Sequence, residues 1–130
     1  IKLIILALYF FLMKPKINII EVDKSIILFI AIDKLSNEVV GRCSLKLREN
    51  KTIRYQDALV DEKHRGKGIY KHLFYSRERY VRKKFKNHVI ESYCKDSTIN
   101  MFLENGFNID SKLYLVKKDR VAMRVNMKAV

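Results

Sequence analysis

The sequence of 130 residues contains few cysteines and lacks segments that would divide it into domains. Cys43 and Cys94 are its only cysteines and lack the C-x-x-C spacing of a metal site, so we expect buried, reduced thiols in a cytoplasmic protein. No cluster of histidine, cysteine and carboxylate residues resembles a metal site. Repeats, low-complexity segments and an interdomain linker are also absent, which predicts a single domain over residues 1–130.

Acidic residues are scarce relative to basic ones. The chain has 14 Asp and Glu against 27 Lys and Arg, which gives a formal net charge of +13 at pH 7. This excess favours an anionic partner, such as nucleic acid, an acidic membrane surface, an acidic protein or a phosphate-rich cofactor, and charge alone does not choose among them. A hydrophobic content of 48% with 32% charged residues indicates a globular chain rather than a disordered one.

The one long apolar run covers residues 1–13, where Lys2 is the only charged residue. As a helix this run is too short to span a bilayer, so we expect no membrane span. No small-residue cleavage site follows it, as a signal peptide would require. Met13 could be the natural start, preceded by an upstream extension or by part of a larger chain. Otherwise the run is a buried strand or a short helix that covers the sheet.

Hydrophobic periodicity predicts a mixed α/β fold. The first four strands should form an antiparallel meander, and the strand that follows the crossover helix should run parallel to the fourth. This arrangement is a central, mostly antiparallel sheet with one parallel pair and flanking helices. The expected strands cover residues 17–22, 25–32, 38–47, 55–60 and 87–94, the helices cover 66–86 and 96–106, and a final hairpin joins 112–117 to 120–127.

The most informative stretch is residues 65–70, Arg-Gly-Lys-Gly-Ile-Tyr, between an apolar strand and the basic helix. The first turn of a helix leaves main-chain N–H groups unpaired and carries the positive end of the helix dipole. Gly66 and Gly68 would let a phosphate approach these groups without a Cβ in the way, while Arg65 and Lys67 add positive charge. The pattern predicts an anion site. An ordinary strand-to-helix turn, in which glycine relieves strain, is the alternative.

Val60, followed five residues later by Arg65-Gly66-Lys67-Gly68-Ile69, resembles the acyl-CoA-binding motif of the GNAT superfamily of N-acetyltransferases. The family pattern is Arg or Gln, two residues, Gly, one residue, and Gly or Ala. Arg65 and Gly68 match this pattern, and Tyr70 departs from its final small residue.

A second feature resembles the same family, an amphipathic helix that ends in Gly-Phe within residues 101–107. With its flanking strands the resemblance runs from about residue 25 to about residue 126. GNAT enzymes usually carry two helices between their first and second strands, and no helical pair lies between residues 17 and 32. This departure concerns recognition of the acceptor rather than binding of the cofactor.

The resemblance implies a GNAT-like fold and the transfer of an acetyl group from acetyl-CoA to a primary amine of a small molecule or protein. It implies that the strands of residues 55–60 and 89–93 splay apart and admit pantetheine between them. Main-chain groups of Leu59 and Val60 would pair with the pantetheine amides, and positioning would supply much of the rate. The amides that would hold the diphosphate belong to Arg65, Gly66, Lys67, Gly68, Ile69 and Tyr70.

The residues that move protons are harder to identify. Many family members have a tyrosine that protonates the thiolate at the position where this chain has Phe102, so Tyr93, Tyr114 or solvent would have to serve. For the proton of the amine, Asp57 and Glu91 lie on the two strands expected to flank the cofactor. The alternative for each carboxylate is a solvent-facing strand residue or a local ion pair. The alternative for Tyr93 is a core aromatic residue.

Two other functions fit the same sequence. A non-catalytic domain that retains the acyl-CoA site would explain Phe102 and the missing helical pair. A nucleic-acid-binding module could use the basic helix face from Arg77 to Lys86, although the chain has no recognised RNA- or DNA-binding motif. His64 and His72 are expected at the surface in every case.

Overall fold

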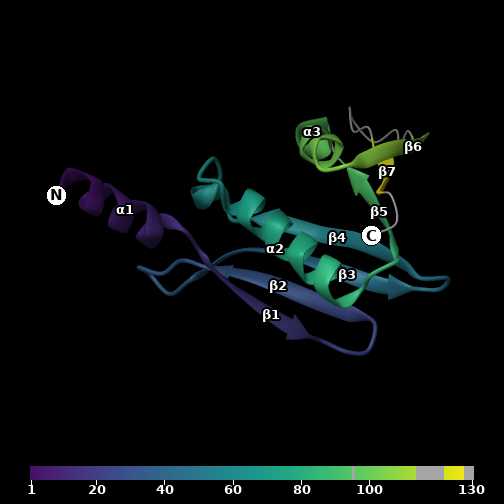
Figure 1. Ribbon diagram of the computed structural model, residues 1–130, viewed down its shortest axis with the longest axis horizontal. Helices are drawn as coiled ribbons and strands as arrows, with labels where there is room; N and C mark the ends of the chain where they lie inside the picture. The colour runs from purple at the N-terminus through teal and green to yellow at the C-terminus, as the bar shows by residue number, and fades with distance from the viewer. Residues whose placement is uncertain (95, 114–121, 128–130) are drawn as a thin grey trace. The chain divides into compact units, whose positions relative to one another are not determined.

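The computed structural model describes residues 1–94, 96–113 and 122–127 (Figure 1). In this part of the chain the residues divide into two compact units, Ile1–Ser44 with Asp57–Tyr80, and Leu45–Gln56 with Val81–Val130. The elements in chain order are α1 (Lys2–Met13), β1 (Lys16–Glu21), β2 (Ile26–Ile32), β3 (Val39–Arg48), β4 (Thr52–Val60), the short 3₁₀ turn η1 (Glu62–His64), α2 (Ile69–Lys84), β5 (Val89–Cys94), α3 (Asp96–Glu104), β6 (Phe107–Leu113) and β7 (Ala122–Met127).

The strand order is β1-β2-β3-β4-β5-β7-β6. β4 and β5 pair in parallel, whereas β1 with β2, β5 with β7, and β6 with β7 pair antiparallel. This topology confirms the predicted mixed sheet with one parallel pair and flanking helices.

The first unit begins with the predicted hairpin of β1 and β2, in register from Lys16 opposite Ile32 to Glu21 opposite Ile27. Its turn is held by the Asp23 carboxylate, whose Oδ1 accepts hydrogen bonds from the Ser25 main-chain N–H at 2.7 Å and the Ser25 hydroxyl at 2.9 Å. Asp23 therefore replaces main-chain partners that the tight turn cannot supply.

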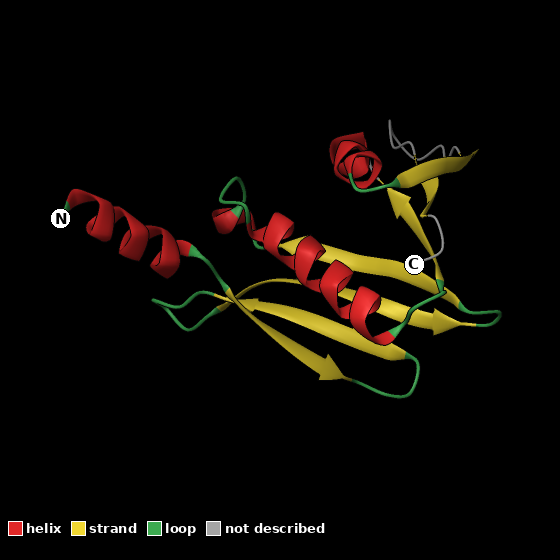
Figure 2. Cartoon of the chain, in the orientation of Figure 1, coloured by secondary structure: helices red, strands yellow, loops and turns green. Residues whose placement is uncertain are grey.

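α2 packs one face against β2 and β3 of the first unit (Figure 2). Ile69 and Leu73 are buried on this face, and the Leu73 carbonyl accepts a weak hydrogen bond from the Cys43 thiol at 3.8 Å. About two turns further along, the Tyr80 ring meets Phe29 edge-on with 5.5 Å between ring centroids. Full burial of a Leu or Phe side chain contributes about 1.5–3 kcal/mol, so this apolar face fixes the helix on the sheet.

α2 is shorter than the helix predicted over residues 66–86. It begins at Ile69 and ends at Lys84. Gly66 and Gly68 have φ angles of 79° and 78°, which lie outside the right-handed helical region, so the helix starts only after them.

Arg77 does not lie on the exposed basic face where the sequence placed it. Its side chain is buried, and its Nη1 donates a hydrogen bond to the Ser44 carbonyl at 3.0 Å, while its guanidinium lies 6.0 Å from the centre of the Phe74 ring. The basic face needed for nucleic-acid binding is therefore smaller than predicted. The exposed cations of the helix are Lys71, Arg79, Arg82, Lys83 and Lys84.

The two cysteines are free and buried, as predicted. Burial raises the pKa of the Cys43 thiol, and the nearby Arg77 charge opposes this rise only in part. A thiol in this environment stays protonated near neutral pH and is a poor nucleophile.

His72 is half-buried rather than a surface residue as predicted. Burial disfavours its charged form and lowers its pKa, and the charges of Lys14, Arg79 and Lys71 act in the same direction. An unfolded histidine titrates near pH 6.5, so below about that pH the unfolded chain binds a proton that the folded chain resists. The free energy of unfolding should therefore fall as pH is lowered from about 7 to 5. In denaturant titrations across this pH range, the free energy of unfolding of His72→Gln should fall less than that of the parent protein. An equal fall in the two proteins would contradict the assignment of this pH dependence to His72.

In the second unit, β4 and β5 pair from Thr52 opposite Val89 to Tyr55 opposite Ser92. This register confirms the predicted parallel pair. The aromatic core of the unit lies beside it, where Phe102 of α3 packs edge-on against Phe107 of β6 with 4.8 Å between ring centroids.

The C-terminal hairpin is present, but its first strand starts at Phe107 rather than at residue 112. The register of β6 against β7 shifts between Ile109 and Ser111, so an irregularity interrupts the pairing of the two strands. Sequence periodicity misses a strand that is interrupted in this way. The predicted tip of the hairpin, Lys118-Asp119, lies outside the described residues.

Residues 1–13 include the short helix α1 rather than a buried strand. Its described side chains are exposed, for example 82% for Leu3 and 56% for Leu8. These apolar residues are therefore not buried, as they would be in a helix that covers the sheet. Among the helices that the structure describes, none is both long enough and apolar enough to cross a membrane.

Candidate functional site

The glycine turn, residues 65–70, joins the end of β4 and η1 to α2 within the first unit. Gly66 and Gly68 both adopt left-handed φ angles, 79° and 78°. A Cβ placed on either residue would meet no atom within 4 Å, so the space in front of both glycines is open. The turn therefore offers main-chain groups that a ligand can approach closely.

The charge of the turn suits an anion. The His72 N–H donates to the Gly68 carbonyl at 3.2 Å, so the i to i−4 bonding of α2 starts there, and the N–H groups at the start of the helix carry the positive end of its dipole. Arg65 and Lys67 are exposed on either side of Gly66. A helix N-terminus, two glycines with open space in front of them and two cations are together suited to a diphosphate.

Three contacts hold the shape of this turn. The Arg65 Nε donates to the Val60 carbonyl at 3.1 Å and so folds the side chain back across the turn. The Asp61 N–H donates to the Val40 carbonyl of β3 at 2.8 Å, and the Asp61 carboxylate lies 3.0 Å from His64 Nδ1. His64 is consequently half-buried and not simply a surface residue. Spacing in the sequence gave no sign of these contacts.

Gly41 brings β3, β4 and α2 together behind the turn. A Cβ at Gly41 would lie 3.2 Å from Ile69 Cγ2, from the Leu59 carbonyl oxygen and from Leu73 Cδ1. The structure gives Gly41 a packing role, because only the absence of a side chain allows these three groups to meet.

The second half of β4 supplies the other predicted contacts with the cofactor. The paired register with β5 ends at Tyr55, while β4 continues to Val60. Leu59 is 49% exposed, so this part of the strand is open to a ligand. Asp57 is exposed and has a φ of 55°, a left-handed conformation that costs a non-glycine residue on the order of 1 kcal/mol. Such strain is common in functional segments.

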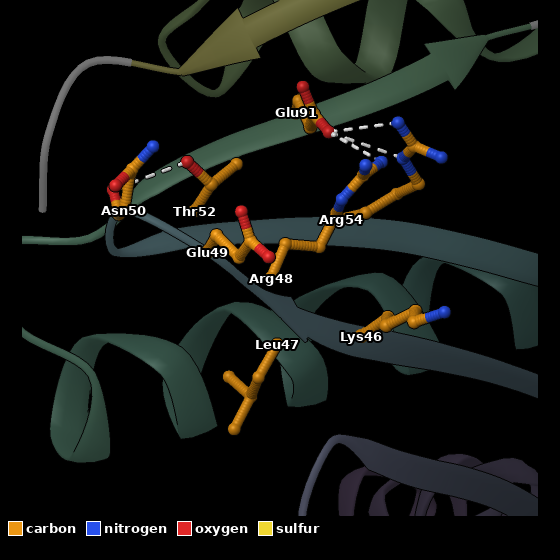
Figure 3. Close-up of a pocket in the computed structure, with 8 residues that line it drawn as sticks. All are labelled: Lys46, Leu47, Arg48, Glu49, Asn50, Thr52, Arg54 and Glu91. Atoms are coloured by element: carbon orange, nitrogen blue, oxygen red, sulfur yellow. Dashed lines mark hydrogen bonds and ion pairs between the residues drawn. The ribbon is translucent and has the colours of Figure 1, made fainter.

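Glu91 and Tyr93 both lie beside Arg54 in the second unit. Glu91 Oε1 accepts hydrogen bonds from Arg54 Nε at 3.2 Å, Arg54 Nη2 at 3.1 Å and Arg48 Nη1 at 3.4 Å (Figure 3). The Arg54 guanidinium lies 5.1 Å from the centre of the Tyr93 ring, which is 44% exposed. The structure thus brings two predicted residues together around one arginine, whereas Asp57 belongs to the other unit.

The sequence contained a signal for this cluster. Arg54 and Glu91 are direct partners in the parallel register of β4 and β5, so opposite charges face each other across the strands. The predicted strands alone did not fix that register, and Arg48 and Arg54 were not singled out.

Phe102 is 2% exposed and belongs to the aromatic core of the second unit. Tyr114 lies outside the described residues. Among the residues that the structure describes, no group of three His, Cys, Asp or Glu side chains could hold a metal ion.

A family model described as the acetyltransferase (GNAT) family matches residues 8–107. A Klebsiella pneumoniae protein described as an acyl-CoA N-acyltransferase superposes with a TM-score of 0.70 at 14% identity, over 91% of this chain and 99% of that one. The spermidine/spermine N-acetyltransferase of Vibrio cholerae gives a TM-score of 0.68 at 16% identity, over 82% of this chain and 66% of that one.

A third structure was solved with a ligand. A Bacillus anthracis protein described as a streptothricin acetyltransferase, in complex with acetyl coenzyme A, gives a TM-score of 0.61 at 24% identity, over 84% of this chain and 65% of that one. At these identities the likeness shows a shared fold. No curated protein matches the sequence.

Proposed function

The chain belongs to the acetyltransferase (GNAT) family, whose members are acyl-CoA-dependent N-acyltransferases, and on that premise we propose that it transfers an acetyl group from acetyl-CoA to an amine. The observation that carries this proposal is the open glycine turn, where Gly66 and Gly68 expose main-chain groups at the N-terminus of α2. Acyl-CoA carries a diphosphate, and the turn has the charge and the access that this group requires.

In the proposed complex, the amides of the glycine turn bind the diphosphate, and Arg65 and Lys67 neutralise its charge. Arg65 is already fixed by its hydrogen bond to the Val60 carbonyl, so little side-chain freedom is lost on binding. Main-chain groups of Leu59 and Val60 continue the contact along the pantetheine arm. This arrangement would place the thioester along the exposed end of β4.

The reaction itself needs no covalent enzyme intermediate. The nitrogen of a neutral amine attacks the thioester carbonyl carbon, a C–N bond forms and the C–S bond breaks. The amine nitrogen gives up a proton, and the departing CoA thiolate gains one. Holding the two reactants in place supplies much of the rate, because it turns a bimolecular step into a unimolecular one.

Of the two carboxylates predicted to accept the proton of the amine, we favour Asp57. Its side chain is exposed on the same strand as Leu59 and Val60. Glu91 is 3% exposed, and its Oε1 already accepts three N–H groups from Arg48 and Arg54, so this oxygen is occupied by protein partners and is not open to an amine. Tyr93, half-exposed beside Arg54, remains the proposed donor to the thiolate.

Asp57→Asn should lower kcat by about 100-fold or more, as expected for loss of a general base, and leave the Kd for acetyl-CoA unchanged. Asparagine tolerates the same left-handed φ as aspartate, so the variant should fold normally. Steady-state kinetics with a calorimetric Kd will measure both effects. Glu38→Gln, which removes an exposed carboxylate elsewhere, is the matched control. Equal kcat values in the Asp57 variant and the parent protein would remove Asp57 from the mechanism.

The activity is tested by incubating the protein with acetyl-CoA and a panel of small amines. Release of the CoA thiol is followed with a thiol reagent, and acetylated products are identified by mass spectrometry. We expect CoA release that depends on the amine. Tight binding of acetyl-CoA without any amine-dependent release would support the non-catalytic acyl-CoA-binding alternative. We also propose a cytoplasmic location, because a reducing compartment keeps a thiol such as that of Cys43 reduced.

A further inference from the structure

An open hollow of about 760 Å³ lies in the second unit, beside the paired part of β4 and β5 (Figure 3). Lys46, Arg48 and Arg54 supply three cations to its lining, and Glu49 and Glu91 supply two carboxylates. Figure 3 shows that Arg48, Arg54 and Glu91 converge, while Leu47 points to the opposite side of β3. The hollow is thus a polar surface built from one face of three neighbouring strands.

The charge that this hollow presents to a ligand is positive. The side chain of Glu91 is only 5% exposed, whereas the side chains of Arg48 and Arg54 are 41% and 29% exposed. The buried carboxylate therefore lies behind the two guanidinium groups and holds them in place. Its own charge is already compensated by three hydrogen bonds.

Both arginines keep donors for a ligand. A guanidinium has five N–H bonds in a planar fork that suits carboxylate and phosphate oxygens. Arg54 directs Nε and Nη2 to Glu91, and Arg48 directs Nη1 there. The Tyr93 ring further restrains Arg54. Among the described residues no other partner occupies the remaining N–H groups, which makes a fixed, partly exposed anion receptor.

We propose that this hollow is the part of the acceptor site that holds an anionic group, a carboxylate or a phosphate, of the amine substrate. The inference rests on the proposed acetyl transfer. Tyr93, the proposed donor to the thiolate, belongs to the same unit as the hollow, and the Arg54 guanidinium that lines the hollow lies 5.1 Å from the centre of its ring. Tyr93 follows Glu91 by two residues and so points to the same side of β5.

This receptor selects a chemical class of acceptor. An amine that also carries a carboxylate or phosphate gains a charge-assisted hydrogen bond in the hollow. A polyamine would bring a second positive charge towards Lys46, Arg48 and Arg54, and like charges repel. The formal net charge of +13 of the whole protein also disfavours the binding of a polyamine.

The test uses pairs of acceptors that differ only in the anionic group. Lysine is compared with cadaverine, which lacks the carboxylate, and O-phosphoethanolamine with ethanolamine, which lacks the phosphate. In at least one pair the anionic member should have a kcat/KM at least about tenfold higher, because hydrogen bonds to charged groups discriminate on this scale. The pair with the larger ratio tells which anion the hollow accepts. Equal or better use of cadaverine and ethanolamine would overturn the proposal.

Arg48→Gln should reduce this preference to less than about threefold and leave the Kd for acetyl-CoA unchanged. Arg54 still donates twice to Glu91 in this variant, so the buried carboxylate keeps a partner and the fold is preserved. Arg42→Gln, an exposed arginine on β3 that does not line the hollow, is the matched control. An unchanged preference in Arg48→Gln, or an equal loss in Arg42→Gln, would also overturn the proposal.

A readout without turnover separates this inference from the proposed function. Inorganic phosphate is titrated into ¹⁵N-labelled protein saturated with coenzyme A, which occupies the glycine turn, and the Nε–Hε signals of the arginines are followed by NMR. Saturable shifts at Arg48 and Arg54 but not at Arg42 would support the receptor even if no amine were acetylated. Absent shifts, or equal shifts at Arg42, would overturn it even if acetyl transfer were established.

Discussion

A Gly68→Val variant is expected to lose acetyl-CoA binding, with a Kd raised by at least 100-fold, or about 2.7 kcal/mol. Gly68 has a φ of 78°, a conformation that valine adopts only with strain. A valine side chain would also fill the open space in front of the main-chain N–H groups, where the diphosphate has to approach. Both effects act on the glycine turn, so calorimetric titration should show little or no heat of binding.

Gly106→Val separates these two effects. Gly106 has a similar left-handed φ of 89° and also has open space where a Cβ would stand, but it follows α3 rather than the glycine turn. In this control, backbone strain should lower the free energy of unfolding by a similar amount, on the order of 1–3 kcal/mol. Its affinity for acetyl-CoA should not change. A folded Gly68→Val protein that binds acetyl-CoA as well as the parent does would remove the turn from the site.

Gly41→Leu is expected to lower both the stability of the fold and the affinity for acetyl-CoA. The three groups that lie 3.2 Å from a Cβ at this position belong to Leu59, Ile69 and Leu73, so a larger side chain forces β4 and α2 away from β3. Overpacking of this kind costs about 1–3 kcal/mol. Because Leu59 and Ile69 border the proposed cofactor contacts, acetyl-CoA affinity should fall at least about tenfold.

Gly41→Ala provides a graded comparison, since a single methyl group needs its neighbours to move by only a few tenths of an ångström. Its melting temperature and affinity should lie between those of the parent and of Gly41→Leu. If Gly41→Leu melted and bound like the parent, the close packing of β3 against α2 would not be what positions the turn.

Much of the fold could be predicted from the sequence because its signals are local. The β-rich runs on either side of Asp23 and the helical spacing of Ile69 and Leu73 depend only on residues that are close in the sequence. The parallel pairing of β4 with β5 followed from the length of the crossover between them. The turn itself could be located for the same reason, since Gly66 and Gly68 are only two residues apart and both adopt left-handed φ angles.

The features that were missed depend on contacts between distant segments. The neighbours of Arg77 in the helix predict a surface cation, but its guanidinium is buried and donates a hydrogen bond to the Ser44 carbonyl of β3. The ion pair of Arg54 with Glu91 requires the register of strands that are 37 residues apart. The early start of β6 at Phe107 was hidden by a register shift that interrupts its pairing with β7.

The central claim is that the glycine turn binds the diphosphate of acetyl-CoA. Calorimetric titration of the parent protein with acetyl-CoA and with S-acetyl-pantetheine, which has the same thioester arm but no diphosphate, tests it most directly. We expect acetyl-CoA to bind with a micromolar Kd, and S-acetyl-pantetheine to bind at least about 100-fold more weakly, because it cannot use the amides at the start of α2 or the charges of Arg65 and Lys67. Equal affinity for the two compounds, or no binding of acetyl-CoA, would contradict the assignment of this turn.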